Sequence, residues 1–127
     1  MREKLEKLLK NSYSPYSHFP VAAIAVMKDG KEFYGVNVEN ASYGATICAE
    51  RSAIVSAISK GYQKGDFKEL YIMVDSDKVS ACCFLCRQVI TELFDKDAEI
   101  ICMSKNDETK FRVSELCPYP FDEEDLK

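Results

Sequence analysis

The stretch VAAIAVMKDG, residues 21–30, is the part of the chain that most directly decides the fold. Its first seven residues form a continuous apolar run, which is typical of a strand buried on both faces of a sheet. Asp29-Gly30 is a strong hairpin signal, because these residues readily take the left-handed conformations of a tight turn. Residues 33–38 are therefore predicted to return beside the first strand as its antiparallel neighbour.

Periodic apolar residues on both sides of this hairpin predict helices and further strands. Leucines at helical spacing indicate a helix over residues 3–11, and serines and prolines mark residues 12–20 as a loop. Apolar residues recur at three- and four-residue steps over residues 49–60, and Gly61 is a suitable C-terminal stop. The remaining expected elements are a strand over 70–74, a helix over 84–94 and strands over 100–103 and 111–113. This order of elements predicts a mixed sheet covered by helices.

The overall composition is that of a globular protein acting on a small molecule. With 127 residues, the chain is expected to form a single domain over residues 1–127. Its net charge of −4 provides no basic field for polyanions, so nucleic acid is not an expected partner. No apolar run approaches the roughly 20 residues of a membrane span, so no membrane partner is expected either. The charged start lacks the apolar segment of a signal peptide, and the expected location is cytoplasmic.

Six cysteines in a chain of this kind favour metal binding or reactive thiols over a disulfide framework. They include Cys48, which is followed by Ala49-Glu50, and the pair Cys83 and Cys86, whose spacing lets both sulfurs reach one ion. Three thiols can leave one position open on a tetrahedral zinc, which distinguishes a catalytic site from a structural one. The pair alone would also suit a redox dithiol or half of a structural zinc site, and Cys82 adds a fourth thiol within reach.

Both cysteine segments are expected at the starts of helices, where unpaired N–H groups and a partial positive charge favour thiolate over thiol. The intervening helix, loop and strand could bring these two helix starts together at one edge of the sheet. Three thiolates would give a zinc site a net negative charge that neighbouring donors must offset. Arg51 and Gln88 are candidates to donate hydrogen bonds to the sulfurs, and Glu50 is a carboxylate that could move protons beside the metal.

Five segments in order along the chain resemble the motifs of the cytidine deaminase family, in its small, homotetrameric branch with an all-cysteine zinc site. The segments are Ser14–Val21, Gly35–Tyr43, Cys48–Ala53, Cys86–Val89 and Val113–Phe121, which are similar to S-P-Y-S-x-F-x-V, G-x-N-x-E-N-A-x-Y, C-A-E-R-[TS]-A, C-R-Q-V and V-x-E-L-L-P-x-x-F. The resemblance covers nearly the whole chain. It implies an α/β fold, a three-layer α/β/α sandwich with a mixed five-stranded sheet.

The resemblance also implies a reaction. This is the zinc-dependent hydrolytic deamination of cytidine and 2'-deoxycytidine to the uridine nucleosides, with release of ammonia, in pyrimidine salvage. One Zn²⁺ per subunit would be held by Cys48, Cys83 and Cys86, with its fourth position open to water. Glu50 would take the proton of the water, deliver it to the pyrimidine N3 and help expel ammonia.

The same resemblance implies which residues bind the nucleoside. Asn37 and Glu39 resemble the pair that holds the ribose hydroxyls, and their two-residue spacing puts both side chains on one face of an extended segment. Phe19 would pack on the base, and the Ala49 backbone would read its polar edge. Phe121 resembles a C-terminal aromatic that enters a neighbouring subunit's site, which implies a homotetramer with shared active sites.

The segment Ala81–Cys86 departs from the family pattern S-P-C-G-A-C. Cys82 replaces the proline, Phe84 the glycine and Leu85 the alanine, and the bulk of Phe84 predicts a differently built turn. Two alternatives therefore stand beside the leading reading. One is the same reaction on another cytosine nucleoside, and the other is a zinc protein without activity in which Cys82 closes the fourth coordination position. Retention of Glu50 argues against the second, because a structural zinc has no use for that carboxylate.

Overall fold

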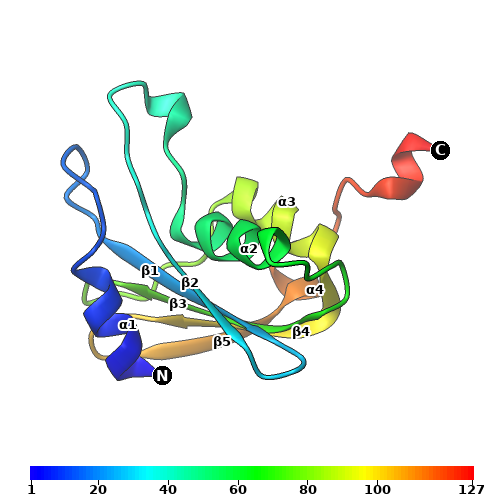
Figure 1. Cartoon of the computed structure of the whole chain (residues 1–127), viewed down its shortest axis with the longest axis horizontal. Helices are drawn as coiled ribbons and strands as arrows, with labels where there is room; N and C mark the ends of the chain where they lie inside the picture. Colours follow the sequence, from blue (N-terminus) through cyan, green and yellow to red (C-terminus); the bar gives the residue numbers. More distant parts are fainter.

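The computed structural model describes all residues 1–127 and contains one five-stranded sheet with helices on both faces (Figure 1). The elements in chain order, with η for 3-10 helices, are α1 (Arg2–Leu9), β1 (Val21–Met27), β2 (Glu32–Val36), η1 (Tyr43–Ala45), α2 (Ala49–Ser59), β3 (Phe67–Val74), α3 (Phe84–Leu93), β4 (Phe94–Met103), β5 (Glu108–Arg112), α4 (Val113–Leu116) and η2 (Glu123–Leu126). None of the helices has the length and apolar content that a membrane crossing needs.

The sheet has the strand order β2-β1-β3-β4-β5 and mixes parallel with antiparallel pairs, as predicted. β1 is antiparallel to both β2 and β3, and β5 is antiparallel to β4. β3 and β4 are parallel, so the chain must cross over between them, and α3 forms that crossover. The start of α3 therefore follows the carboxyl end of β3.

Helices cover both faces of the sheet, which confirms the three-layer arrangement. α2 and α3 pack on one face, over the larger core that includes Ala53 and Ile90. α1 packs on the other face, where Leu5 is fully buried beside Ile24 and Met73. Side chains of β1 alternate between these two cores, which explains why all seven residues of its run are apolar.

The Asp29-Gly30 turn joins β1 to β2, as predicted. Met27 N–H donates to the Lys31 carbonyl at 2.8 Å, and Gly30 takes a φ of +93° that favours glycine. β2 then ends at Val36, short of the predicted limit. Val38 makes only isolated bridges to neighbouring segments, so the chain after β2 stays extended but leaves the sheet.

β4 and β5 both begin earlier than predicted. β4 starts at Phe94, whose ring centroid lies 4.8 Å from that of Phe67 on the parallel neighbour. Charged, mostly exposed residues follow Phe94, so this half of the strand lacks the apolar pattern on which the prediction of a strand was based. β5 spans Glu108–Arg112, and Val113, predicted to end it, instead begins α4.

Gly35 of β2 allows the start of α2 to lie directly against the sheet. A Cβ atom at this position would be 2.4 Å from both the Ala49 carbonyl oxygen and the Ala53 nitrogen. Such distances are far inside van der Waals contact, and both neighbours are backbone atoms that cannot rotate away. The absence of a side chain at residue 35 thus sets how closely the first turn of α2 approaches β2.

Replacing Gly35 by alanine is expected to destabilise the protein by about 1–3 kcal/mol, because the added methyl group must push α2 away from β2. Urea unfolding of the two proteins measures this difference. Gly44→Ala is the matched control, since a Cβ there meets nothing within 4 Å. Equal stability of the Gly35 variant and the wild type would show that α2 does not depend on this close approach.

Candidate active site

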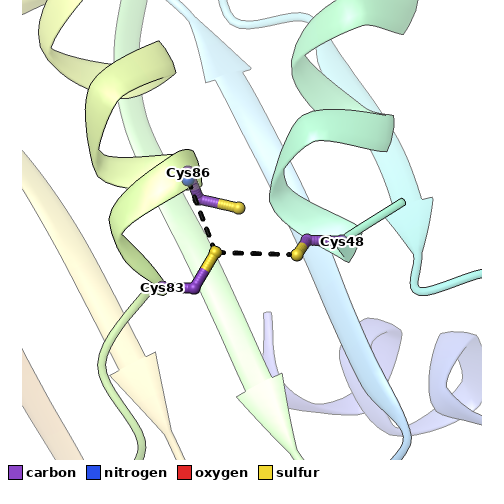
Figure 2. A group of neighbouring side chains, drawn as sticks. All are labelled: Cys48, Cys83 and Cys86. Atoms are coloured by element: carbon purple, nitrogen blue, oxygen red, sulfur yellow. Dashed lines mark hydrogen bonds between the residues drawn. The ribbon is translucent and has the colours of Figure 1, made fainter. Parts of the chain in front are cut away.

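Three thiols from two helix starts form one group (Figure 2). Cys48 is the N-cap of α2, Cys83 is the N-cap of α3, and Cys86 lies in the first turn of α3. Their sulfur atoms all lie within 4.8 Å of one another, and the sulfurs of Cys48 and Cys83 are 3.7 Å apart. The segments between the two helix starts have therefore brought them together, as the sequence predicted.

Donors from both helices hold this group in place. Cys83 Sγ accepts the N–H of Cys86 at 3.5 Å, which ties the side chain to the first turn of α3. Arg51 donates from Nη2 to Cys48 Sγ at 3.4 Å, so the expected contact between Arg51 and a sulfur is present. The Nε of Arg51 is buried without a hydrogen-bond partner. Its N–H is therefore a further donor that could stabilise negative charge on the sulfurs.

Within the thiol group, Cys48 is the cysteine whose pKa favours the thiolate. Hydrogen bonding from Cys86, assisted by Arg51 and Cys83, lowers the pKa of Cys48 to about 5. The same bond raises the pKa of Cys86, which therefore keeps its proton. A divalent cation among the three sulfurs would replace such protons, because metal ligation requires thiolates. The type, number and spacing of the donors thus fit a zinc ion.

Cys82 does not belong to this group, although it directly precedes Cys83. The Cys82 side chain is buried in the core, in the same cluster as Cys102, whereas Cys83 is exposed. Cys83 has an extended backbone with ψ at 163°, and successive side chains of an extended segment point to opposite sides. The alternative in which Cys82 closes the fourth metal position is therefore wrong, because its sulfur lies outside the thiol group.

Phe84 takes the place of the family's glycine without backbone strain. It is the first residue of α3, and His18 is the only non-glycine residue with a positive φ. A turn that requires glycine is thus absent here, because the chain enters the helix at once. The Phe84 side chain points to solvent, where the Arg87 guanidinium carbon lies 4.4 Å from its ring centroid.

Glu50 lies in the first turn of α2 and is only 5% exposed. Burial raises the pKa of Glu50, and the nearby charge of Cys48 raises it further. Its side chain lines the same cavity as Cys48 and Cys83 but is not part of the group that can hold a metal. This is the position expected of a carboxyl group that exchanges protons beside a metal without binding it.

A cavity of about 400 Å³ opens beside the thiols. The residues with predicted roles that line it are Phe19, Asn37, Glu39, Cys48, Ala49, Glu50 and Cys83. Ile72 and Val74 of β3 add an apolar wall. A larger open groove of about 810 Å³ follows α1, but charged residues line most of it and it contains no thiol. The smaller cavity is therefore the one that serves the thiol group.

Asn37 is fixed at the cavity wall by hydrogen bonds within the protein. Its Oδ1 accepts from Ser12 Oγ at 2.5 Å and from Val21 N–H at 2.9 Å, and its Nδ2 donates to the Phe19 carbonyl at 2.9 Å. Both lone pairs of the amide oxygen are thereby used, and one N–H of Nδ2 remains. Asn37 can offer the cavity a single donor.

Glu39 is fixed in a similar way by the loop before β1. Its Oε1 accepts the backbone N–H groups of Tyr16 at 3.0 Å and Ser17 at 3.1 Å, and its Oε2 accepts from the Ser17 hydroxyl. The bond from that hydroxyl is the main cause that lowers the pKa of Glu39, so the carboxylate stays ionised. Asn37 and Glu39 line one cavity together, which agrees with the expectation that they share a face of the extended segment.

Two residues with predicted roles lie apart from both the cavity and the thiol group. Phe121, in the C-terminal tail, is 57% exposed and does not line the cavity of its own chain. The prediction that Gln88 donates to a sulfur was wrong, because its Nε2 donates to the Phe121 carbonyl at 2.6 Å. Residues two apart on a helix do not face the same way, so Gln88 cannot follow Cys86 toward the thiols.

Ser17, Thr46 and Ser80 also line the cavity and were not among the predicted site residues. Ser17 falls inside the segment that resembles S-P-Y-S-x-F, and this motif is the signal that could have found it. Thr46 and Ser80 carry no comparable signal, because only the fold brings their loops to the cavity.

A buried carboxyl group beside three metal-binding thiols is the arrangement of a zinc-dependent hydrolase. A family model for the cytidine and deoxycytidylate deaminase zinc-binding region matches residues 1–104. The chain therefore belongs to the cytidine deaminase family, and Cys48, Cys83 and Cys86 form a group that could hold the zinc ion of this family.

Relatives are similar over nearly the whole chain. A probable cytidine deaminase of Dictyostelium discoideum is 42% identical over 98% of this chain and 88% of its own length. A cytidine deaminase of Halalkalibacterium halodurans is 40% identical over 92% of this chain and 88% of its own. The crystal structure of the cytidine deaminase from Burkholderia pseudomallei matches with a TM-score of 0.89 at 38% identity, over 94% of both chains. The sandwich described above is thus the fold of this family.

Replacing Cys83 by serine is expected to lower the zinc content from about one ion per chain to roughly a tenth or less, because a hydroxyl does not ionise to a ligand near neutral pH. Metal analysis of the dialysed proteins by mass spectrometry measures the loss. Cys117→Ser is the control, since Cys117 is half-buried and lies outside the thiol group. Stoichiometric zinc in the Cys83 variant would contradict the assignment of this ligand.

Proposed function

We propose that residues 1–127 act as one domain that hydrolyses the C4 amino group of cytidine and 2'-deoxycytidine, giving the uridine nucleoside and ammonia. The observation that carries this proposal is the buried Glu50 carboxyl group, which lines one cavity together with the thiols and with two fixed polar side chains, Asn37 and Glu39. One end of the cavity thus offers hydrolytic chemistry and the other offers recognition of a hydroxyl group.

Cys48, Cys83 and Cys86 would hold the zinc ion. When bound, the ion supplies a Lewis acid that makes water nucleophilic near neutral pH. Three thiolates weaken such an acid by their charge, and Arg51 counters this effect by donating to Cys48 Sγ. The buried Nε of Arg51 is a second donor for the same purpose.

Glu50 moves the protons of the reaction. Its carboxylate takes a proton from the attacking water, and the carboxylic acid then delivers it to N3 of the pyrimidine. As the C4–O bond replaces the C4–N bond, the remaining water proton passes through Glu50 to the leaving nitrogen, which departs as ammonia. Burial raises the pKa of Glu50, which suits a group that must both accept and return a proton.

The base would lie between Phe19 and the apolar wall formed by Ile72 and Val74. Ala49 is the first residue of α2, and the first N–H groups of a helix have no partner within the helix. The Ala49 N–H can therefore donate to a carbonyl acceptor on the polar edge of the base. This contact would orient the ring so that C4 faces the thiol end of the cavity.

Asn37 and Glu39 would read a sugar hydroxyl. Asn37 has one free N–H, and the ionised Glu39 can only accept. A hydroxyl group is the simple ligand that satisfies both, because its oxygen accepts from Asn37 while its hydrogen is donated to Glu39. Such a pair would select a free nucleoside. We therefore propose that the reaction belongs to pyrimidine salvage. We also propose that it takes place in the cytoplasm.

We also infer a homotetramer whose active sites are shared. The C-terminal tail projects away from the body of its own chain (Figure 1), and it carries Tyr119 at 94% and Phe121 at 57% exposure. The bond from Gln88 Nε2 to the Phe121 carbonyl and the ion pair between Lys64 and Glu123 tie the tail to the body of its own chain. An aromatic ring presented in this way suits the cavity of a neighbouring copy.

Replacing Glu50 by glutamine is expected to lower kcat for cytidine by about 10²–10⁴-fold with zinc content unchanged, because the amide cannot exchange the protons of the reaction. The loss of cytidine absorbance in the ultraviolet gives the rate. Glu92→Gln, at an exposed position of α3, is the matched control. A zinc-loaded wild type that is inert toward both cytidine and deoxycytidine would overturn the proposed function.

Replacing Phe121 by alanine is expected to raise KM for cytidine about tenfold, as loss of an aromatic contact commonly does. Co-assembly with the Glu50→Gln variant should recover part of the activity, because each intact Glu50 can then receive Phe121 from a neighbour. Light scattering gives the assembly mass, and Leu126→Ala is a control for the exposed tail. A fully active protein with a mass of 14.4 kDa in solution would exclude shared sites.

A further inference from the structure

Ser17 connects two parts of the cavity that lie far apart in the sequence. Its hydroxyl donates to Glu39 Oε2 and accepts the backbone N–H of Phe19 at 3.1 Å. Its own N–H donates to Glu39 Oε1 at 3.1 Å. Ser17 thus forms hydrogen bonds with Glu39, whose carboxylate is proposed to bind the sugar, and with the backbone of Phe19, whose ring is proposed to cover the base.

The hydrogen-bond capacity of Glu39 is almost used up by this loop. Oε1 accepts two N–H groups, from Tyr16 and Ser17, which occupy both of its lone pairs. Oε2 accepts one hydroxyl, from Ser17, and keeps one lone pair. Glu39 therefore has a single acceptor position for a ligand, on the same oxygen that Ser17 holds.

The turn that carries Ser17 is conformationally constrained. His18, the next residue, has a φ of +56° and is the only non-glycine residue of the chain in the left-handed region. On its N-terminal side, the N–H groups of Tyr16 and Ser17 donate to the Glu39 carboxylate. On its C-terminal side, the N–H of Phe19 donates to the Ser17 hydroxyl. Bonds from this one serine therefore help to maintain a backbone shape that the local sequence does not favour.

We propose that Ser17 is a positioning residue that holds Glu39 Oε2 in the orientation that accepts one sugar hydroxyl of the nucleoside. The inference rests on the proposed nucleoside site. Ser17 does not itself donate to the nucleoside, because the single hydrogen of its hydroxyl is donated to Glu39. Its removal takes the hydroxyl donor away from Oε2, so that water can bind there in its place, while the two N–H bonds to Oε1, the thiols and Glu50 are untouched.

The expected consequence is a loss of binding and not of chemistry. An interaction made equally with substrate and transition state affects KM while kcat stays unchanged. Hydrogen bonds to charged groups have effects of about tenfold or more on binding. Ser17→Ala is therefore expected to raise KM for cytidine about tenfold, with kcat within about threefold of wild type.

The test compares ligands with and without the sugar on the zinc-loaded protein. Inhibition constants are measured for uridine and for 1-methyluracil, with cytidine as substrate. In Ser17→Ala, the constant for uridine should rise about tenfold and that for 1-methyluracil less than about threefold. Ser17→Thr, which keeps a hydroxyl, should restore uridine binding. Ser59→Ala, at the exposed end of α2, should leave both constants unchanged because the Ser59 hydroxyl donates only to the Val55 carbonyl of its own helix.

Two results would overturn the inference. Wild-type constants in Ser17→Ala would show that Glu39 does not need the hydroxyl, and equal losses for both inhibitors would show a general disturbance of the loop. If Ser17→Ala fails to fold, as judged by thermal melting and zinc content, Ser17→Cys provides the same comparison with a weaker donor. Failure of the wild type to deaminate cytidine would count against the proposed function, whereas an active wild type with an unaffected Ser17→Ala variant counts against this inference alone.

Discussion

The contact between the first turn of α2 and β2 is the constraint on which the rest of the site depends. Gly35 places no atom between the strand and the Ala49 carbonyl, so the helix begins at backbone contact with the sheet. Cys48 and Glu50 flank Ala49, so the same close approach fixes the position of both residues beside β2. The crossover after β3 then needs only to bring the start of α3 to this point for the thiols to meet.

The site combines two demands on electrostatics that usually conflict. Sulfurs that bind a metal must lose their protons, and two helix starts together with Arg51 favour that charge. Glu50, a few ångströms of backbone away, must instead hold a proton for part of the cycle, and burial favours its neutral form. One helix terminus satisfies both, because Cys48 Sγ accepts from Arg51 while the Glu50 side chain, which lines the cavity, is almost fully buried.

Local periodicity was enough to predict most of the fold, and the failures have physical causes. β1, its turn at Gly30 and α2 followed from patterns within a few residues. The first half of β4 was missed because its charged side chains are exposed and only Phe94 and Ala98 are buried there. The family motifs located the thiols, but only the structure could separate Cys82 from them, since spacing does not say which way a side chain points.

The polar end of the cavity was harder to predict because its bonds join segments remote in sequence. The family motifs point to Asn37 and Glu39, which line the cavity, yet the partners that fix them, Ser12 and Ser17, lie 25 and 22 residues away. The spacing of apolar residues along the chain gives no information about hydrogen bonds between segments so far apart in the sequence. Gln88 shows the converse error, in which proximity in sequence to Cys86 suggested a contact that helix geometry forbids.

The unequal burial of the three thiols has a consequence for how the metal is exchanged. Cys86 is buried, Cys48 is partly covered and Cys83 is exposed. Cys83 is therefore the thiol of the group that solvent reaches most easily, and a chelator or a competing thiophilic metal would meet its sulfur before that of Cys86.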